Sequence, residues 1–409
     1  MTKLERLIQE LCPDGVEYKT IEECTEKTGK IKWNNHKYDD FQYIDLTSVD
    51  RDRHIIVKTQ TINSENAPSR AQQIVKHNDI LFGTTRPTLM RYCYIPNSYD
   101  KQICSTGFCV LRVKKDIILS KWLYHNITSS DFFSYVESNQ KGASYPAISD
   151  KEVKQYKIPV PPLEVQAEIV RILDNFTELT AELTAELTAR KKQYEYYRNK
   201  LLSFNNAVNI MPLSNIAKVF RGEYITKKGS VIGDIPVILG GQEPAYYINK
   251  SNHEGEIVVV SRSGASAGFV SYWDEPIFLT DGFGFEAKED VAIPKYIYYI
   301  LKRKEKELNA MKRGAGVPHV SGELLSKVEL PIPSIETQKR LIKVLDNFEA
   351  ICSDLNIGLP AEIEARQKQY EYYRDLLLTF AETGGKLADR QTDRQTDRQT
   401  DRQTDRQTG

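Results

Sequence analysis

Four loops carry side chains that could form specific hydrogen bonds with a ligand. Two of them, 83–88 and 261–266, directly follow apolar segments at 80–82 and 257–260 that are predicted to be strands. The other two, 141–145 and 312–319, contain glycine. The side chains of interest are Thr84, Thr85, Arg86, Thr88, Lys141, Ser144, Tyr145, Ser261, Arg262, Ser263, Lys312, Arg313 and His319. Arginine can bind a guanine edge with two hydrogen bonds, hydroxyls can donate to phosphates or bases, and a tyrosine ring can stack. For each arginine, the alternative is a solvated loop residue or a local ion pair.

No motif in the sequence predicts that the chain itself catalyses a reaction. It has neither a GxxxxGK[ST] loop for nucleotide phosphates nor the Asn/Asp-Pro-Pro-Tyr/Phe motif of adenine methyltransferases. Residues 13–19 resemble a PD…ExK nuclease core only superficially, because two residues between Asp14 and Glu17 leave no room for its hairpin. The histidines form no metal-binding pattern and the cysteines contain no CxxC. We therefore expect no metal site, and we expect Cys104 and Cys109 to be buried thiols.

The composition limits the classes of protein that fit. The 409 residues carry 56 basic and 56 acidic side chains, so the formal net charge is zero. A protein that holds nucleic acid by bulk charge needs a large cationic excess, and this class is therefore excluded. The length predicts two or three domains. Residues 1–11 include acids, and no stretch of 18 residues is wholly apolar, so we expect no signal peptide, no membrane span and a cytoplasmic location.

An internal repeat organises the chain. Residues 157–166 match 329–338, and Leu-Asp-Asn-Phe occurs at both 173–176 and 345–348. The segment Lys-Gln-Tyr-Glu-Tyr-Tyr-Arg is identical in both copies. Weaker matches lie upstream, and they pair 142–149 with 314–321, 105–108 with 280–283, and 80–86 with 257–262. These matches divide the chain into variable and constant blocks with the bounds 1–157, 158–204, 205–329, 330–380 and a tail at 381–409.

The constant blocks are predicted to be long helices. From Leu163 to Phe204 no glycine or proline intervenes, and apolar residues recur at intervals of three or four. Such a helix is roughly 60 Å long at about 1.5 Å per residue. Gly358 and Pro360 should divide the second block into helices over 334–356 and 361–380. We expect the two blocks to pack as an antiparallel coiled coil; the alternative is ordinary core helices of one large domain.

A shorter repeat lies inside the first helix. Thr-Ala-Glu-Leu occurs at 180–183 and again at 184–187. A four-residue unit on an α-helix advances the chain by about 6 Å and rotates it by about 40°. Gain or loss of one unit would therefore displace whatever the helix carries by these amounts. The alternative is that alanine, glutamate and leucine are simply good helix formers.

Several of these features together resemble one known family. They are the paired variable and helical blocks, the Ile-Pro-Val-Pro and Leu-Pro-Ile-Pro segments, the Thr-Ala-Glu-Leu repeat and the Lys-Gln-Tyr-Glu-Tyr-Tyr-Arg ends. The chain is similar, over about residues 1–380, to the specificity subunit of a type I restriction-modification system. The resemblance implies an α+β fold: two globular mixed α/β target recognition domains separated by two long helical regions that pack as an antiparallel coiled coil, with a pseudo-two-fold internal repeat.

The resemblance also implies a function and partners. Each variable block would read one half of a bipartite site on double-stranded DNA, and the helices would set the gap and dock two modification subunits. Two restriction subunits would complete the complex, which methylates adenine and cleaves DNA through its partners. This chain would hold no cofactor; S-adenosylmethionine, ATP and Mg²⁺ would bind to the partner subunits. One Thr-Ala-Glu-Leu unit would shift a DNA contact by roughly one to two base pairs.

Charge and tyrosine content refine these expectations. The first variable block has 23 basic and 20 acidic residues and the second has 15 of each, so a few well-placed donors must read the bases.

The tyrosines at the two equivalent helix ends are predicted to form part of the docking surface, with helix–helix packing as the alternative. These tyrosines are Tyr194, Tyr196, Tyr197, Tyr370, Tyr372 and Tyr373.

Two other classes of function remain as alternatives. An enzyme with fused specificity is disfavoured because its catalytic motifs are missing. A stand-alone, sequence-specific DNA-binding regulator would need its own phosphate contacts, and charge neutrality counts against it.

The tail suggests a genetic switch. Residues 389–408 are five copies of Asp-Arg-Gln-Thr, with no apolar side chain, and are predicted to be disordered. A tandem ACAG repeat encodes this sequence in every reading frame. We hypothesise phase variation by gain or loss of copies; the alternative is an inert tail or a remnant of cloning.

Overall fold

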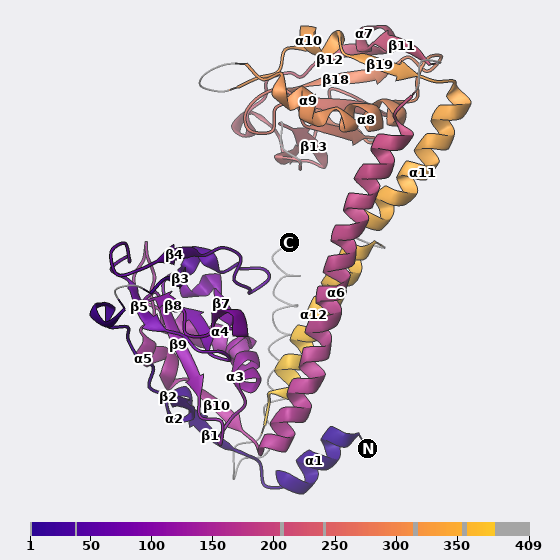
Figure 1. Cartoon of the computed structure of the whole chain (residues 1–409). Helices are drawn as coiled ribbons and strands as arrows, with labels where there is room; N and C mark the ends of the chain where they lie inside the picture. Colours follow the sequence, from indigo (N-terminus) through magenta and orange to yellow (C-terminus); the bar gives the residue numbers. More distant parts are fainter. Residues whose placement is uncertain are drawn as a thin grey trace. The chain divides into compact units, whose positions relative to one another are not determined.

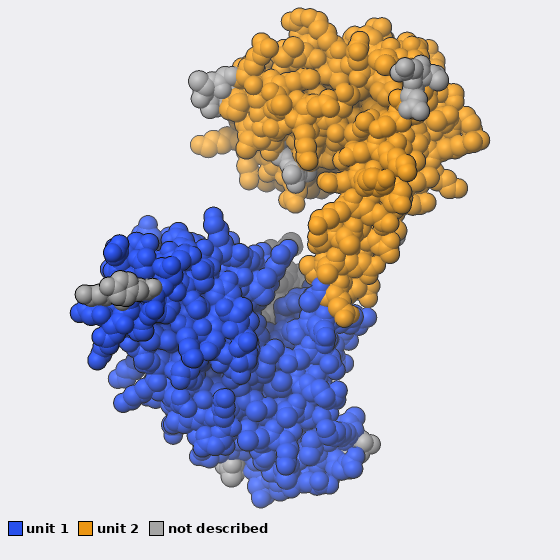
Figure 2. All heavy atoms as spheres, viewed as in Figure 1, with its two compact units in different colours: residues 1–181, 364–409 blue, residues 182–363 orange. Residues whose placement is uncertain are grey.

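The computed structural model describes residues 2–36, 39–204, 208–239, 243–313, 318–353 and 358–380. The chain forms two compact units (Figure 2), which are Met1–Ala181 with Glu364–Gly409, and Glu182–Ile363. The repeat tail lies outside the described residues, and with it the prediction of disorder and the hypothesis of phase variation. Among the described helices, none is long and apolar enough to cross a membrane.

The first unit contains a mixed α/β domain built around a short buried strand, β6 (Ile80–Gly83). β6 lies inside the sheet β2-β9-β6-β7 and pairs antiparallel with both neighbours, of which β7 and β9 are labelled in Figure 1. All four of its residues are buried, with Ile80 and Phe82 in one core cluster and Leu81 in another. A second sheet has the order β4-β3-β8-β5. These strands span β2 Thr25–Glu26, β3 Phe41–Ile44, β4 Gln60–Ile62, β5 Ala71–Ile74, β7 Tyr92–Tyr94, β8 Ile103–Ser105 and β9 Phe108–Val113. The helices are α1 Lys3–Leu11, α2 Ile21–Cys24, α3 Ser120–Ile127, α4 Ser130–Asn139 and α5 Asp150–Gln155, with short 3-10 turns η1 Trp33–Asn35, η2 Leu46–Ser48, η3 Pro87–Leu89 and η4 Asn97–Tyr99.

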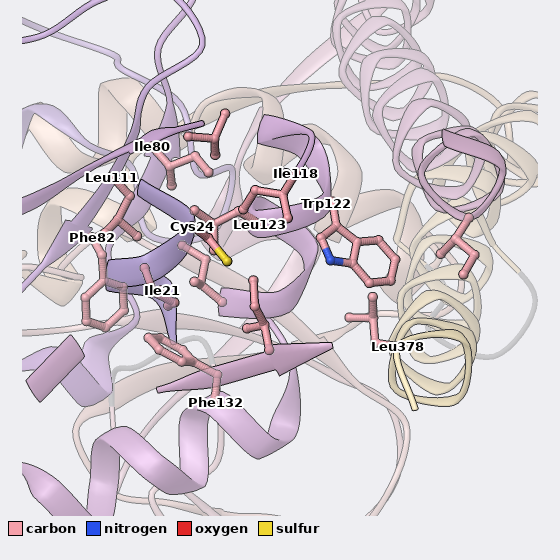
Figure 3. Packing of buried hydrophobic residues seen from close by; sticks show 14 of the residues in the cluster. Ile21, Cys24, Ile80, Phe82, Leu111, Ile118, Trp122, Leu123, Phe132 and Leu378 are labelled. Atoms are coloured by element: carbon pink, nitrogen blue, oxygen red, sulfur yellow. The ribbon is translucent and has the colours of Figure 1, made fainter. Parts of the chain in front are cut away.

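The main core of this domain joins the sheet to the helices that cover it. Phe82 on β6, Trp122 on α3 and Phe132 on α4 are fully buried in one cluster (Figure 3), and the rings of Phe82 and Phe132 meet edge to face at 5.2 Å. Burial of such large rings is a major contribution to the stability of the core. Cys104 and Cys109 are also completely buried, as predicted.

The second unit repeats the same plan. Its central strand β15 (Ile257–Ser261) is buried along its whole length within the sheet β12-β18-β15-β16, and a smaller sheet has the order β14-β13-β17. The remaining strands are β12 Ala217–Arg221, β13 Ile235–Ile238, β14 Tyr246–Ile248, β16 Val270–Trp273, β17 Phe278–Leu279 and β18 Gly282–Ala287. Its helices are α7 Leu213–Ile216, α8 Pro294–Arg303, α9 Glu305–Ala310 and α10 Gly322–Ser326, with the 3-10 turn η5 Lys227–Gly229.

Each domain is closed by a two-stranded sheet that leads into a long helix. In the first unit β1 (Glu17–Thr20) pairs antiparallel with β10 (Lys157–Val160). In the second unit β11 (Asn209–Pro212) pairs in the same way with β19 (Glu329–Ile332). The proline-containing segments that the repeat identified are therefore these final strands. The pseudo-two-fold repeat thus holds for the structure as well as for the sequence.

The constant blocks are helical. α6 runs without a break over Leu163–Leu201, and the second block forms α11 (Ile335–Ser353) and α12 (Leu359–Leu377). The chain bends at Gly358, so the predicted division of the second block is confirmed. α12 begins two residues before the predicted start, because Pro360 is accommodated in its first turn.

In each unit α6 packs antiparallel against a C-terminal helix. In the first unit Phe176 stacks on Tyr373 of α12, with ring centroids 5.5 Å apart. In the second unit Tyr197 stacks on Phe348 of α11 at 5.7 Å. Phe176 and Phe348 are equivalent residues of the repeat, as are Tyr197 and Tyr373.

We predict that Leu173→Ala destabilises the first unit much more than Leu179→Ala. Leu173 is fully buried between α6 and the first domain, whereas Leu179 on the same helix is 36% exposed. The buried truncation should cost about 2–5 kcal/mol, and the exposed one less than about 1 kcal/mol. Denaturant unfolding followed by circular dichroism measures both, and equal effects of the two substitutions would contradict this packing.

Candidate nucleic-acid interface

The structure brings the two predicted loops of the first domain together. The loop after β6 and the loop at 141–147 are joined by backbone hydrogen bonds: Arg86 N–H donates to Pro146 O at 2.7 Å and Ile148 N–H donates to Thr84 O at 3.0 Å. The second loop closes on itself through a pair of bonds between Lys141 and Ala147, at 2.8 and 2.9 Å. The side chains from the two loops therefore share one surface.

Arg86 and Tyr145 form the most prominent feature of this surface. Arg86 is exposed, and its guanidinium carbon lies 4.9 Å from the centre of the Tyr145 ring. The Tyr145 side chain is 73% exposed. A cation–π contact of this kind holds both groups in place while the guanidinium hydrogens stay free to bind a ligand.

The other predicted residues of this pair of loops differ in what they can contact. Lys141 and Ser144 are exposed, and Lys141 lies 3.5 Å from Glu152. Thr85 and Thr88 are half-buried. The expectation for Thr84 needs correction, since its side chain is buried and its hydroxyl donates to Gly107 O at 2.9 Å; these groups support the loop.

The second domain forms the same pair of loops. Val320 N–H donates to Arg262 O at 2.9 Å, and Arg313 and His319 exchange two backbone bonds of 3.0 Å. The side chains of Arg313 and His319 are both exposed. Residues 314–317, between them, lie outside the described part of the chain.

Several predicted contacts of the second domain are used within the protein. Arg262 lies 3.7 Å from Asp281, and the Ser263 hydroxyl donates to the same carboxylate. Ser261 is buried, and the Lys312 ammonium donates to Ala265 O at 2.8 Å. The local ion pair left open for Arg262 is therefore what the structure contains. Burial of Ser261 corrects its expected role, whereas Lys312 keeps further donors and its DNA contact stays a prediction.

Backbone contacts also correct the alignment of the two loops. Arg86 N–H donates to Pro146 O, and in the second domain Gly264 N–H donates to Pro318 O at 3.0 Å. Both residues adopt a left-handed backbone, with φ of 49° for Arg86 and 76° for Gly264. Arg86 therefore corresponds to Gly264 and not to Arg262. The two domains present different side chains at this position of the same framework.

The predicted tyrosines behave as three equivalent pairs. Tyr196 and Tyr372 are 60% and 58% exposed, so both helix ends present a tyrosine to the outside. Tyr197 and Tyr373 are the residues that stack on phenylalanine, which is the packing alternative. Tyr370 is buried.

The remaining pair contributes to packing rather than to an open surface. The Tyr370 hydroxyl lies 3.0 Å from Nδ1 of the buried His125, and burial raises the pKa of Tyr370. Tyr194 is half-buried, and its ring lies 6.5 Å from that of Phe348. Their contacts within the chain therefore leave Tyr370 and Tyr194 little surface for docking a partner subunit.

Two buried glutamines that position the domains were not predicted from the sequence. Gln166 on α6 and Gln338 on α11 are completely buried, and each bonds to the domain of its own unit. Both lie in the repeated segments that end at 166 and 338, so their identity in the two copies was the available signal.

Comparison with known proteins identifies the family. A model of the type I restriction modification DNA specificity domain matches residues 13–190 and again 205–365. The chain is 32% identical over 292 residues to a putative type I restriction enzyme specificity subunit of Haemophilus influenzae, covering 65% of this chain and 74% of that protein. It is 34% identical over 295 residues to the EcoR124I/EcoR124II specificity subunit of Escherichia coli, covering 64% and 71%.

Solved structures share the fold. A chain from a study of complex assembly and conformational transition of a type I R-M system superposes with a TM-score of 0.64 at 22% identity, covering 90% of this chain and 98% of that one. The type I S subunit from M. genitalium gives a TM-score of 0.56 at 17% identity, covering 89% and 96%. Since the family model covers most of the sequence in two copies, the chain belongs to the specificity subunits of type I restriction-modification systems.

Proposed function

We propose that this chain is the non-catalytic DNA-recognition subunit of a type I restriction-modification complex. Each domain reads one half of a bipartite site, and the helices set the gap between the halves. The observation that carries this proposal is the pair of loops that occurs in both domains with the same backbone bonds and different outward side chains. A common framework with different side chains suits two related domains that read different sequences.

The exposed groups of the two loop pairs suit reading of base edges in the major groove. Arg86 can bind guanine O6 and N7 with two hydrogen bonds, and Tyr145 both orients it and can stack or contact a sugar. In the second domain Arg313 and His319 are the exposed donors. The zero net charge supports a division of labour in which partner subunits supply much of the phosphate contact.

The helices carry the other half of the proposal. α6 continues from Leu163 to Leu201, through both Thr-Ala-Glu-Leu units. Since one unit corresponds to about 6 Å and 40°, the number of units would fix the gap to within one or two base pairs. Tyr196 and Tyr372, at equivalent helix ends, would each dock one of two modification subunits.

The chemistry of the complex belongs to the partners in this proposal. Two modification subunits would bind S-adenosylmethionine and methylate adenine, and two restriction subunits would use ATP and Mg²⁺ for translocation and cleavage. The lack of nucleotide-binding and methyltransferase motifs in this sequence supports that assignment.

The isolated chain should bind DNA weakly, and the complex with its modification subunits should bind it tightly. Phosphate contacts dominate affinity, and this chain has no cationic excess. The recognition motif is first read from the adenines that the complex methylates in a genome. Fluorescence anisotropy with a duplex that contains this motif, at several salt concentrations, then measures both affinities. Tight, site-specific binding by the chain alone would favour the alternative of a stand-alone regulator.

Arg86→Ala should remove discrimination at one base pair of one half-site and leave the other half-site unchanged. Loss of a bidentate contact costs about 1–3 kcal/mol. Sequencing of methylated adenines in a genome that carries the variant complex reads this directly. Arg6→Ala, which removes an exposed arginine on α1, is the matched control. If Arg86→Ala weakened binding to every sequence equally, Arg86 would be a phosphate contact.

Replacing Tyr196 and Tyr372 together by alanine should weaken assembly with the modification subunits, because exposed tyrosines are enriched at the centre of protein interfaces. Each truncation is expected to cost about 1–2 kcal/mol of association free energy. Analytical ultracentrifugation measures the assembly. Tyr224→Ala, which removes a tyrosine that is 88% exposed on the second domain, should leave assembly intact. Equal assembly of both variants would exclude this docking surface.

A further inference from the structure

Each recognition domain is joined to its helix by one buried glutamine, and the two joints are the same. In the first unit Gln166 Oε1 accepts the Leu119 N–H at 2.9 Å. The Gln166 amide donates to Ile117 O at 3.1 Å and to Pro161 O at 2.8 Å. The side chain therefore uses both donors and an acceptor, and all of its partners are backbone groups of the same unit.

The second unit repeats this arrangement bond for bond. Gln338 Oε1 accepts the Ile293 N–H at 2.9 Å, and the amide donates to Val291 O at 3.1 Å and to Pro333 O at 2.9 Å. Ile293 caps α8, as Leu119 caps α3 in the first unit. Both glutamines are 0% exposed. The same three bonds therefore hold the domain to its helix in both units.

A second contact in each joint ties the domain to the strand before the helix. Trp122 Nε1 donates to Pro159 O at 2.9 Å, and the Tyr296 hydroxyl donates to Pro331 O at 2.8 Å. These bonds fix the domain through a different side chain and a different carbonyl from those of the glutamines.

An ion pair completes each joint one turn or more further along the helix. Lys121 lies 3.3 Å from Asp174, and Lys295 lies 3.1 Å from Asp346. Three contacts at different heights restrain rotation of the domain about the helix as well as translation along it. A single contact would restrain only position.

We propose that Gln166 and Gln338 are positioning residues that lock the angle and height of each recognition domain on its helix, and that this lock is what gives the complex a fixed gap between half-sites. The inference rests on the proposed function. One base pair corresponds to about 34–36° and 3.4 Å. If a domain could rotate or shift on its helix by this amount, the complex would also bind sites whose gap differs by one base pair. This would hold even if the helices themselves were rigid.

The test is gap tolerance of the assembled methyltransferase complex. The wild-type motif is first read from methylated DNA, and duplexes are then made with both half-sites intact and the gap altered by one base pair in either direction. Transfer of labelled methyl groups is measured with wild type, Gln166→Glu and Gln338→Glu. A carboxylate cannot donate to the two carbonyls, so the joint loosens while side-chain size is kept. Gln193→Glu, an exposed glutamine on α6, is the matched control.

Wild type and Gln193→Glu should lose on the order of tenfold activity per base pair of altered gap, similar to one mismatched pair. The joint variants should lose less than about threefold while still rejecting changed half-site bases, which global weakening would not produce. A gap preference as sharp as that of wild type in both joint variants would overturn the proposal.

A second variant covers the case in which buried glutamate prevents folding. Tyr296→Phe removes only the hydroxyl that bonds to Pro331 O, and it keeps the buried ring. It should relax the gap preference by a smaller factor in the same direction, and an unchanged preference would count against the joint. If wild type itself showed no gap preference, the proposed function would fail, and that result is distinguishable because it appears before any substitution is made.

Discussion

The helical part of the structure depends on aromatic stacking between residues of the two repeats. The tyrosine near the end of each repeat stacks on the phenylalanine of the other repeat, as Tyr373 on Phe176 and Tyr197 on Phe348. Offset stacking of this kind adds about 0.5–1.5 kcal/mol beyond the burial of apolar area. Because each contact needs one residue from each copy, the C-terminal block packs against α6 at both Phe176 and Tyr197. The two copies of the repeat are thereby packed against each other in both units.

Much of the fold could be predicted because its signals are periodic or repeated. The unbroken apolar spacing after Leu163 predicted α6, and Gly358 with Pro360 predicted the division between α11 and α12. Two short apolar segments that end in polar loops predicted the central strands β6 and β15. These features follow from local chemistry of the chain, which is visible without knowledge of the tertiary structure.

The candidate site was less predictable because burial of a polar side chain depends on residues far away in sequence. The Thr84 hydroxyl donates to the carbonyl of Gly107. Arg262 forms an ion pair with Asp281, and the Ser263 hydroxyl donates to the same carboxylate. The alignment of Arg86 with Arg262 failed for a similar reason, because strand pairing and a left-handed turn, not residue similarity, determine which positions correspond. The joints at the glutamines consist of bonds to backbone groups, which leave no trace in a single sequence except the repeat itself.

Removal of one Thr-Ala-Glu-Leu unit, residues 184–187, tests whether the length of α6 sets the gap between the half-sites. The methylated motif of the shortened complex should keep both half-sites and change its gap by one or two base pairs, since the deletion removes about 6 Å and 40° of helix. An unchanged gap, or altered bases in either half-site, would show that the length of α6 does not set the spacing.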